Sequence, residues 1–446
     1  MKNIHRIIFS LFATAAVVSG LSSCERADYP DRFRPTEGVP VVHSVMYSSN
    51  GVYTEQAFME EIVCILGENL TSVRKVFFND QEAVLNTSFI TPNTLLVAVP
   101  KTMPVVETDK LYLITRDEKT VEYGFKVLPP APKVNEMAFE YAEPGTVTTI
   151  YGNYFYEKPD GVKLAIEFPG AEVTDIKEIA IDHVTFTIPE GAQPGRVKVT
   201  TASGTSASAF MYKDNRGLLF DFDGTNGLYT TNQGWHPQKV ASEGGFSGNY
   251  LQLGDGATPL AGDGSDWNDA LYHFEYWAGT YKELEDYGTW DGRRLIDIVD
   301  FTAFNTMVIK FEINISADTP WKGTPMQLIF APVSLVSNSP ADAKDIYGVT
   351  LGGQNNTYFH DEAVSLPRAM WEPWKATGSY DTNGEWVTVT IPVSDFVYFW
   401  DGKKATGTLL PESFSNLEIF VAAGDGSGAS SAPLMKIDNV RAVPAK

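Results

Sequence analysis

The apolar residues of this chain recur at every second position over short stretches, which is the period of a β-strand with one buried face. Val184, Phe186 and Ile188 alternate with threonines, and the segments 309–315 and 386–391 show the same alternation. No segment repeats its apolar residues with the helical period of 3.6 over any length. Strands joined by turns are therefore predicted along the chain, and we expect an all-β fold.

Two stretches follow the same plan on either side of the proline-rich segment 128–132. Each has an apolar strand that reaches a glycine and an asparagine, at 65–70 and again at 150–155. A second strand follows, at 76–78 and at 162–168, and then a third that ends in proline, at 95–100 and at 184–189. This order resembles the IPT/TIG immunoglobulin-like fold. Two tandem immunoglobulin-like sandwiches are therefore expected at residues 39–128 and 129–213, each of a suitable size.

The rest of the chain, residues 214–446, has a different plan. It opens with an apolar segment at 217–224 and closes with another at 434–440, and turn-rich spacers separate the alternating segments between them. A stretch of this length and pattern favours a larger, jelly-roll-like β-sandwich with long loops.

The first residues are typical of an export signal rather than of a folded domain. Lys2 and Arg6 precede an apolar stretch, residues 7–18, that is shorter than the about 20 residues needed to span a bilayer. Leu21-Ser22-Ser23-Cys24 resembles the lipobox of bacterial lipoproteins. We therefore expect a signal peptide at 1–23, acylation of Cys24, a lipidated linker at 24–38, and export to the outer-membrane surface. An ordinary signal peptide with an incidental cysteine is the alternative.

Length and charge narrow the choice of partners. A chain of 446 residues suggests about two to four domains. Its net charge of −22 repels the phosphates of nucleic acids and disfavours polyanionic glycans, so neutral sugars remain. With Cys24 acylated, Cys64 has no cysteine partner, and no disulfide is expected.

The tryptophans are confined to the last part of the chain. None occurs before residue 214, and all nine follow: Trp235, Trp267, Trp277, Trp290, Trp321, Trp371, Trp374, Trp386 and Trp400. Together with the lipobox and the paired modules, this distribution resembles the surface glycan-binding proteins of Bacteroidota polysaccharide-utilisation systems. The C-terminal part is similar to the domain of xyloglucan- and mixed-linkage β-glucan-binding members. The resemblance implies spacer modules, a neutral polysaccharide or oligosaccharide as ligand, and a neighbouring glycan transporter complex.

Aromatic side chains in turn-rich segments are the candidate sugar contacts, because an indole offers a flat apolar face to the C–H groups of a pyranose. Regular strands are expected to bury Trp386, and Trp400 follows other aromatic residues. The predicted sugar-binding residues are Trp290, Trp321, Tyr287, Trp277, Trp371 and Trp374.

The sequence has no Gly-x-Ser-x-Gly elbow, His-Glu-x-x-His helix or phosphate-binding loop. We therefore predict a binding protein rather than an enzyme, without a cofactor and without a metal site. Three alternatives stay open. They are a glycoside hydrolase using carboxylates such as Glu283, Glu285 and Asp286, an adhesin for a host protein, and a structural calcium held by Asp221, Asp223 and Asp438.

Overall fold

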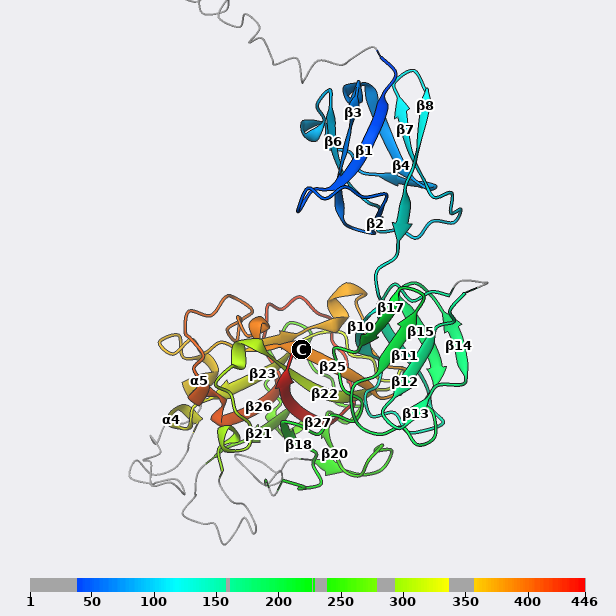
Figure 1. The fold of residues 1–446 in the computed structure, drawn as a ribbon. Coiled ribbons are helices and arrows are strands. Elements are labelled where there is room, and N and C mark those ends of the chain that lie inside the picture. The colour runs from blue at the N-terminus through cyan, green and yellow to red at the C-terminus, as the bar shows by residue number, and fades with distance from the viewer. Residues whose placement is uncertain are drawn as a thin grey trace, which may run out of the picture. The chain divides into compact units, whose positions relative to one another are not determined.

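The computed structural model describes residues 38–157, 161–226, 228, 239–278, 293–336 and 357–445. In these ranges the chain is built almost wholly of antiparallel strands, so the predicted all-β fold is confirmed (Figure 1). No described helix has both the length and the apolar character needed to cross a membrane. The chain forms two compact units, Met1–Ala131 and Pro132–Lys446.

The first unit contains one immunoglobulin-like sandwich. Its strands form the sheets β1-β3-β6 and β5-β4-β7-β8, and β2 and β9 form a separate parallel pair. Val63 and Ile65 of β3 and Leu111 and Leu113 of β7 point into the core between the sheets. The strands are β1 (Val41–Tyr47), β2 (Gln56–Phe58), β3 (Ile62–Glu68), β4 (Val73–Phe78), β5 (Gln81–Ala83), β6 (Thr94–Ala98), β7 (Lys110–Thr115), β8 (Thr120–Gly124) and β9 (Lys126–Leu128).

The second unit begins with a second sandwich, which we call the second module. Its sheets are β10-β11-β15-β14 and β13-β12-β16-β17. Ile150, Ile166 and Phe186 are among the residues of its core. The strands are β10 (Lys133–Met137), β11 (Val147–Asn153), β12 (Ala165–Phe168), β13 (Ala171–Glu172), β14 (Ile176–Ile179), β15 (His183–Thr187), β16 (Lys198–Thr201) and β17 (Gly204–Ala207).

The same glycine geometry occurs in both sandwiches. Gly67 of β3 lies opposite a register shift in β1, and Gly152 of β11 lies opposite one in β10. A Cβ atom at Gly67 would lie 1.9 Å from the carbonyl oxygen of Val41, and one at Gly152 would lie 1.8 Å from that of Lys133. Only glycine lets the two backbones approach this closely, which explains the repeated glycine of the sequence.

The remainder of the second unit is a larger two-sheet sandwich, which we call the C-terminal sandwich. The inner sheet is β19-β20-β27-β22-β25, with β18 also pairing with β27, and the second sheet is β21-β26-β23-β24. The strands are β18 (Leu218–Phe220), β19 (Val240–Ala241), β20 (Tyr250–Leu253), β21 (His273–Tyr276), β22 (Met307–Ile315), β23 (Met326–Ala331), β24 (Ala369–Trp371), β25 (Val387–Pro392), β26 (Asn416–Val421) and β27 (Met435–Pro444). Phe311, Leu328 and Ile419 are part of the core that these two sheets enclose.

The helices among the described residues are short and lie in the connections. The α-helices are α2 (Asp269–Tyr272), α4 (Val333–Val336) and α5 (Thr357–His360). The 3₁₀ turns are η3 (Leu70–Ser72), η4 (Thr87–Phe89), η5 (Leu295–Asp297), η6 (Phe304–Thr306), η7 (Pro373–Ala376), η8 (Val393–Asp395) and η9 (Pro411–Ser415).

Two predicted strands are shorter than expected. The segment expected at 162–168 becomes a strand only at Ala165, because the amide of Leu164 donates to the Glu157 carboxylate instead of to a neighbouring strand. The segment expected at 217–224 ends as a strand at Phe220. There the Asp221 carboxylate accepts the amides of Asp223, Gly224 and Thr225, and this turn replaces the strand ladder.

Candidate functional site

The face of the sheet β21-β26-β23-β24 that points away from the core is unusually polar. Strand alternation directs Phe274 and Tyr276 inward, where both contact Phe220. His273 and Glu275 therefore point outward, and the same alternation directs Glu418 of β26 to the same side, opposite Glu275. We call this side of the sheet the outer face, although His273, Glu275 and Glu418 are themselves buried.

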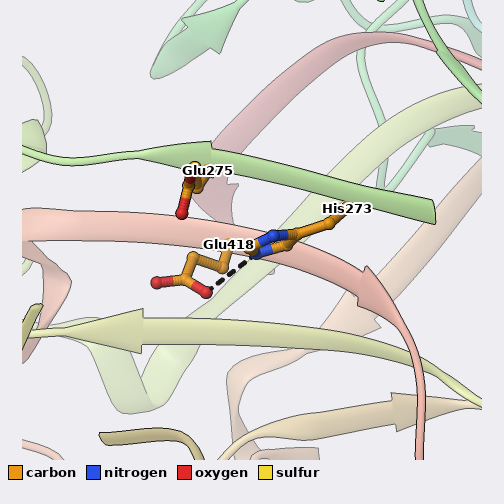
Figure 2. A group of neighbouring side chains, drawn as sticks. All are labelled: His273, Glu275 and Glu418. Atoms are coloured by element: carbon orange, nitrogen blue, oxygen red, sulfur yellow. Dashed lines mark hydrogen bonds and ion pairs between the residues drawn. The ribbon is translucent and has the colours of Figure 1, made fainter. Parts of the chain in front are cut away.

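A buried polar cluster lies at the β21–β26 end of the outer face. Glu418 reaches the imidazole of His273, with Oε2 3.0 Å from Nε2, and Glu275 lies beside them (Figure 2). The indole Nε1 of Trp277 donates to the other Glu418 oxygen at 3.2 Å. Burial alone would lower the pKa of His273, but the hydrogen bond to Glu418 and the charges of Glu418 and Glu275 raise it above its usual range.

A second polar cluster lies at the β23–β24 end of the outer face. The guanidinium of Arg368, just before β24, donates to Gln327 Oε1 at 3.0 Å and to the carbonyl oxygen of Phe359 at 2.8 Å. Gln327 in turn donates to the carbonyl oxygen of Ala422 at 2.7 Å. All of these groups are buried, so they fix the backbone positions around them rather than meeting solvent.

Four aromatic rings lie at the rim of the outer face, and we call them the Trp267 cluster. The Trp267 ring centroid is 4.7 Å from that of Phe359, 6.0 Å from Trp400 and 6.3 Å from Phe420. Phe420 itself stacks on His273, with centroids 4.3 Å apart. Trp267 is 44% exposed, whereas Phe359 and Phe420 are buried. The buried rings therefore support an indole that is partly open to solvent.

Trp321, Trp277 and Trp374 do not lie where a sugar could reach them, so the expectation of sugar contact is corrected for these three. Trp321 has no exposed surface, because its Nε1 donates to the carbonyl oxygens of Gly323 and Thr324 and its ring packs in the core. Trp277 is 2% exposed and is held by Glu418, and Trp374 is 3% exposed.

Sugar contact by Trp371, Trp290 and Tyr287 stays a prediction. Trp371 is half-buried, and its ring contacts Phe311, Trp321 and Tyr380. Trp290 and Tyr287 lie outside the described residues. Sequence reasoning counted Trp267 among the nine tryptophans but gave it no role. Its setting in the polar, glycine-containing run Gly262 to Asp266 is the signal that would have marked it as exposed.

One group of side chains has the composition of a cation site. His273, Glu275 and Glu418 bring ligand atoms within 4.8 Å of one another, and it is the one such group among the residues that the structure describes. One imidazole and two carboxylates suit a divalent transition metal. Asp221, Asp223 and Asp438 do not form a group of this kind, and the Asp221 carboxylate accepts backbone amides instead.

Comparison with known proteins gives a consistent result. Residues 212–444 match the family described as surface glycan-binding protein B xyloglucan binding domain. The crystal structure of the surface glycan-binding protein PbSGBP-B from Prevotella bryantii is 38% identical, with a TM-score of 0.72, over 92% of this chain and all of that one.

Two further matches are weaker. An IPT/TIG domain-containing protein of Bacteroides ovatus is 26% identical over 212 residues, which are 42% of this chain and 42% of the relative. A surface glycan-binding protein from a xyloglucan utilisation locus of Bacteroides uniformis is 15% identical over 91% of this chain and all of that one, with a TM-score of 0.33.

Proposed function

We propose, because this chain belongs to the surface glycan-binding protein B family, that its C-terminal sandwich binds a neutral plant β-glucan and retains it at the cell surface for uptake. The family is one of glycan-binding proteins. Xyloglucan and mixed-linkage glucan are the ligands we favour, and the exposed indole of Trp267 at the rim of the outer face is the observation that carries the proposal.

The Trp267 cluster has the properties that a sugar platform needs. The rings of Phe359, Trp400 and Phe420 contact the Trp267 ring, so little side-chain freedom is lost when a pyranose stacks on it. Covering roughly 50 Å² of apolar surface contributes about 1 kcal/mol per ring. A few such rings with some hydrogen bonds predict a dissociation constant of roughly 10 μM to 1 mM, which suits a protein that passes its ligand on.

In this proposal the protein captures the glucan without cleaving it. A glycoside hydrolase needs two carboxyl groups that flank the scissile bond. Glu275 and Glu418 are adjacent on the outer face, but both are buried, and Glu418 is engaged by His273 and Trp277. We therefore expect no release of reducing sugar from the glucans that the protein binds.

The proposal also includes the route to the cell surface. A signal peptide at 1–23 would direct export. Acylation of Cys24 would then supply more than one lipid tail, enough for stable attachment to the outer membrane. A neighbouring glycan transporter complex would then receive the bound oligosaccharide.

Affinity electrophoresis tests the platform. In gels that contain xyloglucan or mixed-linkage glucan, we expect the wild-type protein to be retarded and Trp267→Ala to bind about fivefold to tenfold more weakly, because one stacking face is lost. Tyr53→Ala is the control, since Tyr53 is also an exposed aromatic residue but lies in the first unit.

Each result bears on a different part of the proposal. A wild-type protein that no neutral glucan retards would contradict glycan capture by the sandwich. Unchanged retardation of Trp267→Ala would assign the platform to other rings, with Trp290 and Tyr287 as the next to test. Reducing sugar in the same mixtures would show a hydrolase, and retention only by a host protein would show an adhesin.

A further inference from the structure

A buried charge network joins the second module to the C-terminal sandwich. Glu140 follows β10 in the second module, and its Oε2 accepts a hydrogen bond of 2.8 Å from Arg441 Nη2, while its Oε1 pairs with Lys310 Nζ. Arg441 also donates to Glu312, at 2.8 Å from Nη1 and 3.0 Å from Nη2. All four side chains are buried.

The charges of this network balance only when the second module takes part. Arg441 and Lys310 lie on β27 and β22, and they face Glu312, also on β22, together with Glu140. Without Glu140, two buried cations would face a single carboxylate. A buried charge that loses its partner strongly destabilises the structure around it, so the C-terminal sandwich contains an ion-pair network that the second module completes.

Hydrogen bonds between the segment after β10 and Thr388 of β25 also define how the second module is oriented on the sandwich. The amide of Thr388 in β25 donates to the carbonyl oxygen of Ala138 at 2.9 Å. The amide of Glu140 donates to the Thr388 hydroxyl at 2.8 Å, and that hydroxyl donates to Glu312 at 3.0 Å. The chain after β10 therefore runs along the edge strand of the inner sheet, which fixes its position relative to the sandwich (Figure 1).

Aromatic rings cover one side of the network. Phe139 and Tyr141 of the second module have ring centroids 5.0 Å and 5.9 Å from Phe246 of the sandwich. Phe246 in turn lies 4.9 Å from Trp386. The guanidinium of Arg441 lies 5.1 Å from the centroid of Tyr141, a cation–π contact across the interface.

We propose that the second module and the C-terminal sandwich act as one rigid recognition body, and that Glu140 is the residue that closes it. The immunoglobulin-like fold of the second module suggests a spacer, but in this proposal the module is not one. It forms part of the binding unit and fixes the direction in which the sandwich presents its outer face.

Cleavage of the connecting segment tests this proposal in the full chain. A recognition sequence for a site-specific protease is inserted after Asn215, which is exposed between the second module and the sandwich. After cleavage of the wild-type protein, we expect the two pieces to stay together in gel filtration. For Glu140→Ala, we expect the dissociation constant between the pieces to rise about a hundredfold or more, because two buried cations lose a partner.

Two further variants complete the design. Glu143→Ala is the matched control, because Glu143 is an exposed carboxylate of the same module that pairs with Lys213, and we expect it to leave the pieces together. Glu140→Gln keeps the shape of the side chain but not its charge, and it should also weaken the association if the uncut Glu140→Ala protein does not fold. Wild-type pieces that separate at micromolar concentration, or Glu140→Gln pieces held as tightly as wild type, would overturn the proposal.

Discussion

The carboxyl group of Asp438 in β27 has no surface exposed to solvent. Burial is the main reason that its pKa is raised, to about 8, and the charges of Glu312 and Asp223 add to the effect. Hydrogen bonds from the Asn439 amide and the Ser247 hydroxyl act in the opposite direction but do not outweigh burial. Asp438 is therefore mostly protonated in the folded protein near pH 7.

This shift predicts a pH-dependent stability. An unfolded aspartate releases its proton near pH 4, whereas folded Asp438 keeps it up to about pH 8, so stability is lost as the pH rises through that window. Asp438→Asn removes the ionisable group, and we expect its melting temperature at pH 8.5 to exceed that of the wild type by about 5 °C or more. At pH 4 the two proteins should melt together, as scanning calorimetry can show.

The control for this variant is Asp318→Asn, because Asp318 is exposed and should leave the melting temperature unchanged at both pH values. A melting temperature of Asp438→Asn below that of wild type at pH 8.5 would show instead that an ionised Asp438 stabilises the fold.

The tryptophans show how far residue-scale reasoning reached. Their confinement to the last part of the chain indicated a sugar-binding sandwich, and the family match agrees with it. The polar run before Trp267 favours an exposed ring, but for the other tryptophans a turn-rich segment is no guide to exposure, since exposure depends on packing between distant segments. Trp321 sits in a turn-rich segment that looked exposed, yet its indole nitrogen is satisfied inside the core by Gly323 and Thr324. Trp267 is exposed because Phe359 and Phe420, far along the chain, fill the space beneath it.

At the scale of elements, the paired strands that carry Gly67 and Gly152 are the clearest link between sequence and structure. In both sandwiches the glycine faces a carbonyl oxygen across a register shift, so a local packing demand appears twice in the sequence. Such a demand is visible without a structure because no other residue meets it. Strand ends were harder to predict, as at β18, where the side chain of Asp221 rather than the apolar pattern stops the strand.

Alanine at these glycines is expected to destabilise one compact unit at a time, the first unit for Gly67 and the second unit for Gly152. In Gly67→Ala and Gly152→Ala the new methyl group overlaps a backbone oxygen, and we expect each change to destabilise its own sandwich by about 2–3 kcal/mol. Scanning calorimetry should show a lower melting transition for the first unit in Gly67→Ala while the second unit keeps its transition. Gly124→Ala is the control, since nothing lies within 4 Å of the added Cβ. Equal transitions in all three variants would contradict the close approach.

At the scale of the whole molecule, the net charge of −22 should select among glycans of the same backbone. We expect xyloglucan to bind at least tenfold more tightly than a carboxymethylated xyloglucan at low ionic strength, as measured by titration calorimetry. The difference should shrink between about 0.01 M and 1 M salt, because the screening length falls from about 30 Å to about 3 Å. A preference that salt does not change would indicate that the carboxymethyl groups clash with the site instead of being repelled by its charge.

The position of β27 also determines when the C-terminal sandwich can be completed. β27 lies between β20 and β22 in the inner sheet, yet every other strand of that sheet precedes it along the chain. A polypeptide that emerges from its amino end must therefore wait for this strand before the sheet can close, and the same strand brings Arg441 to Glu140, 301 residues earlier. While the chain is being synthesised, the earlier strands of this sheet therefore stay without their central partner until β27 has emerged.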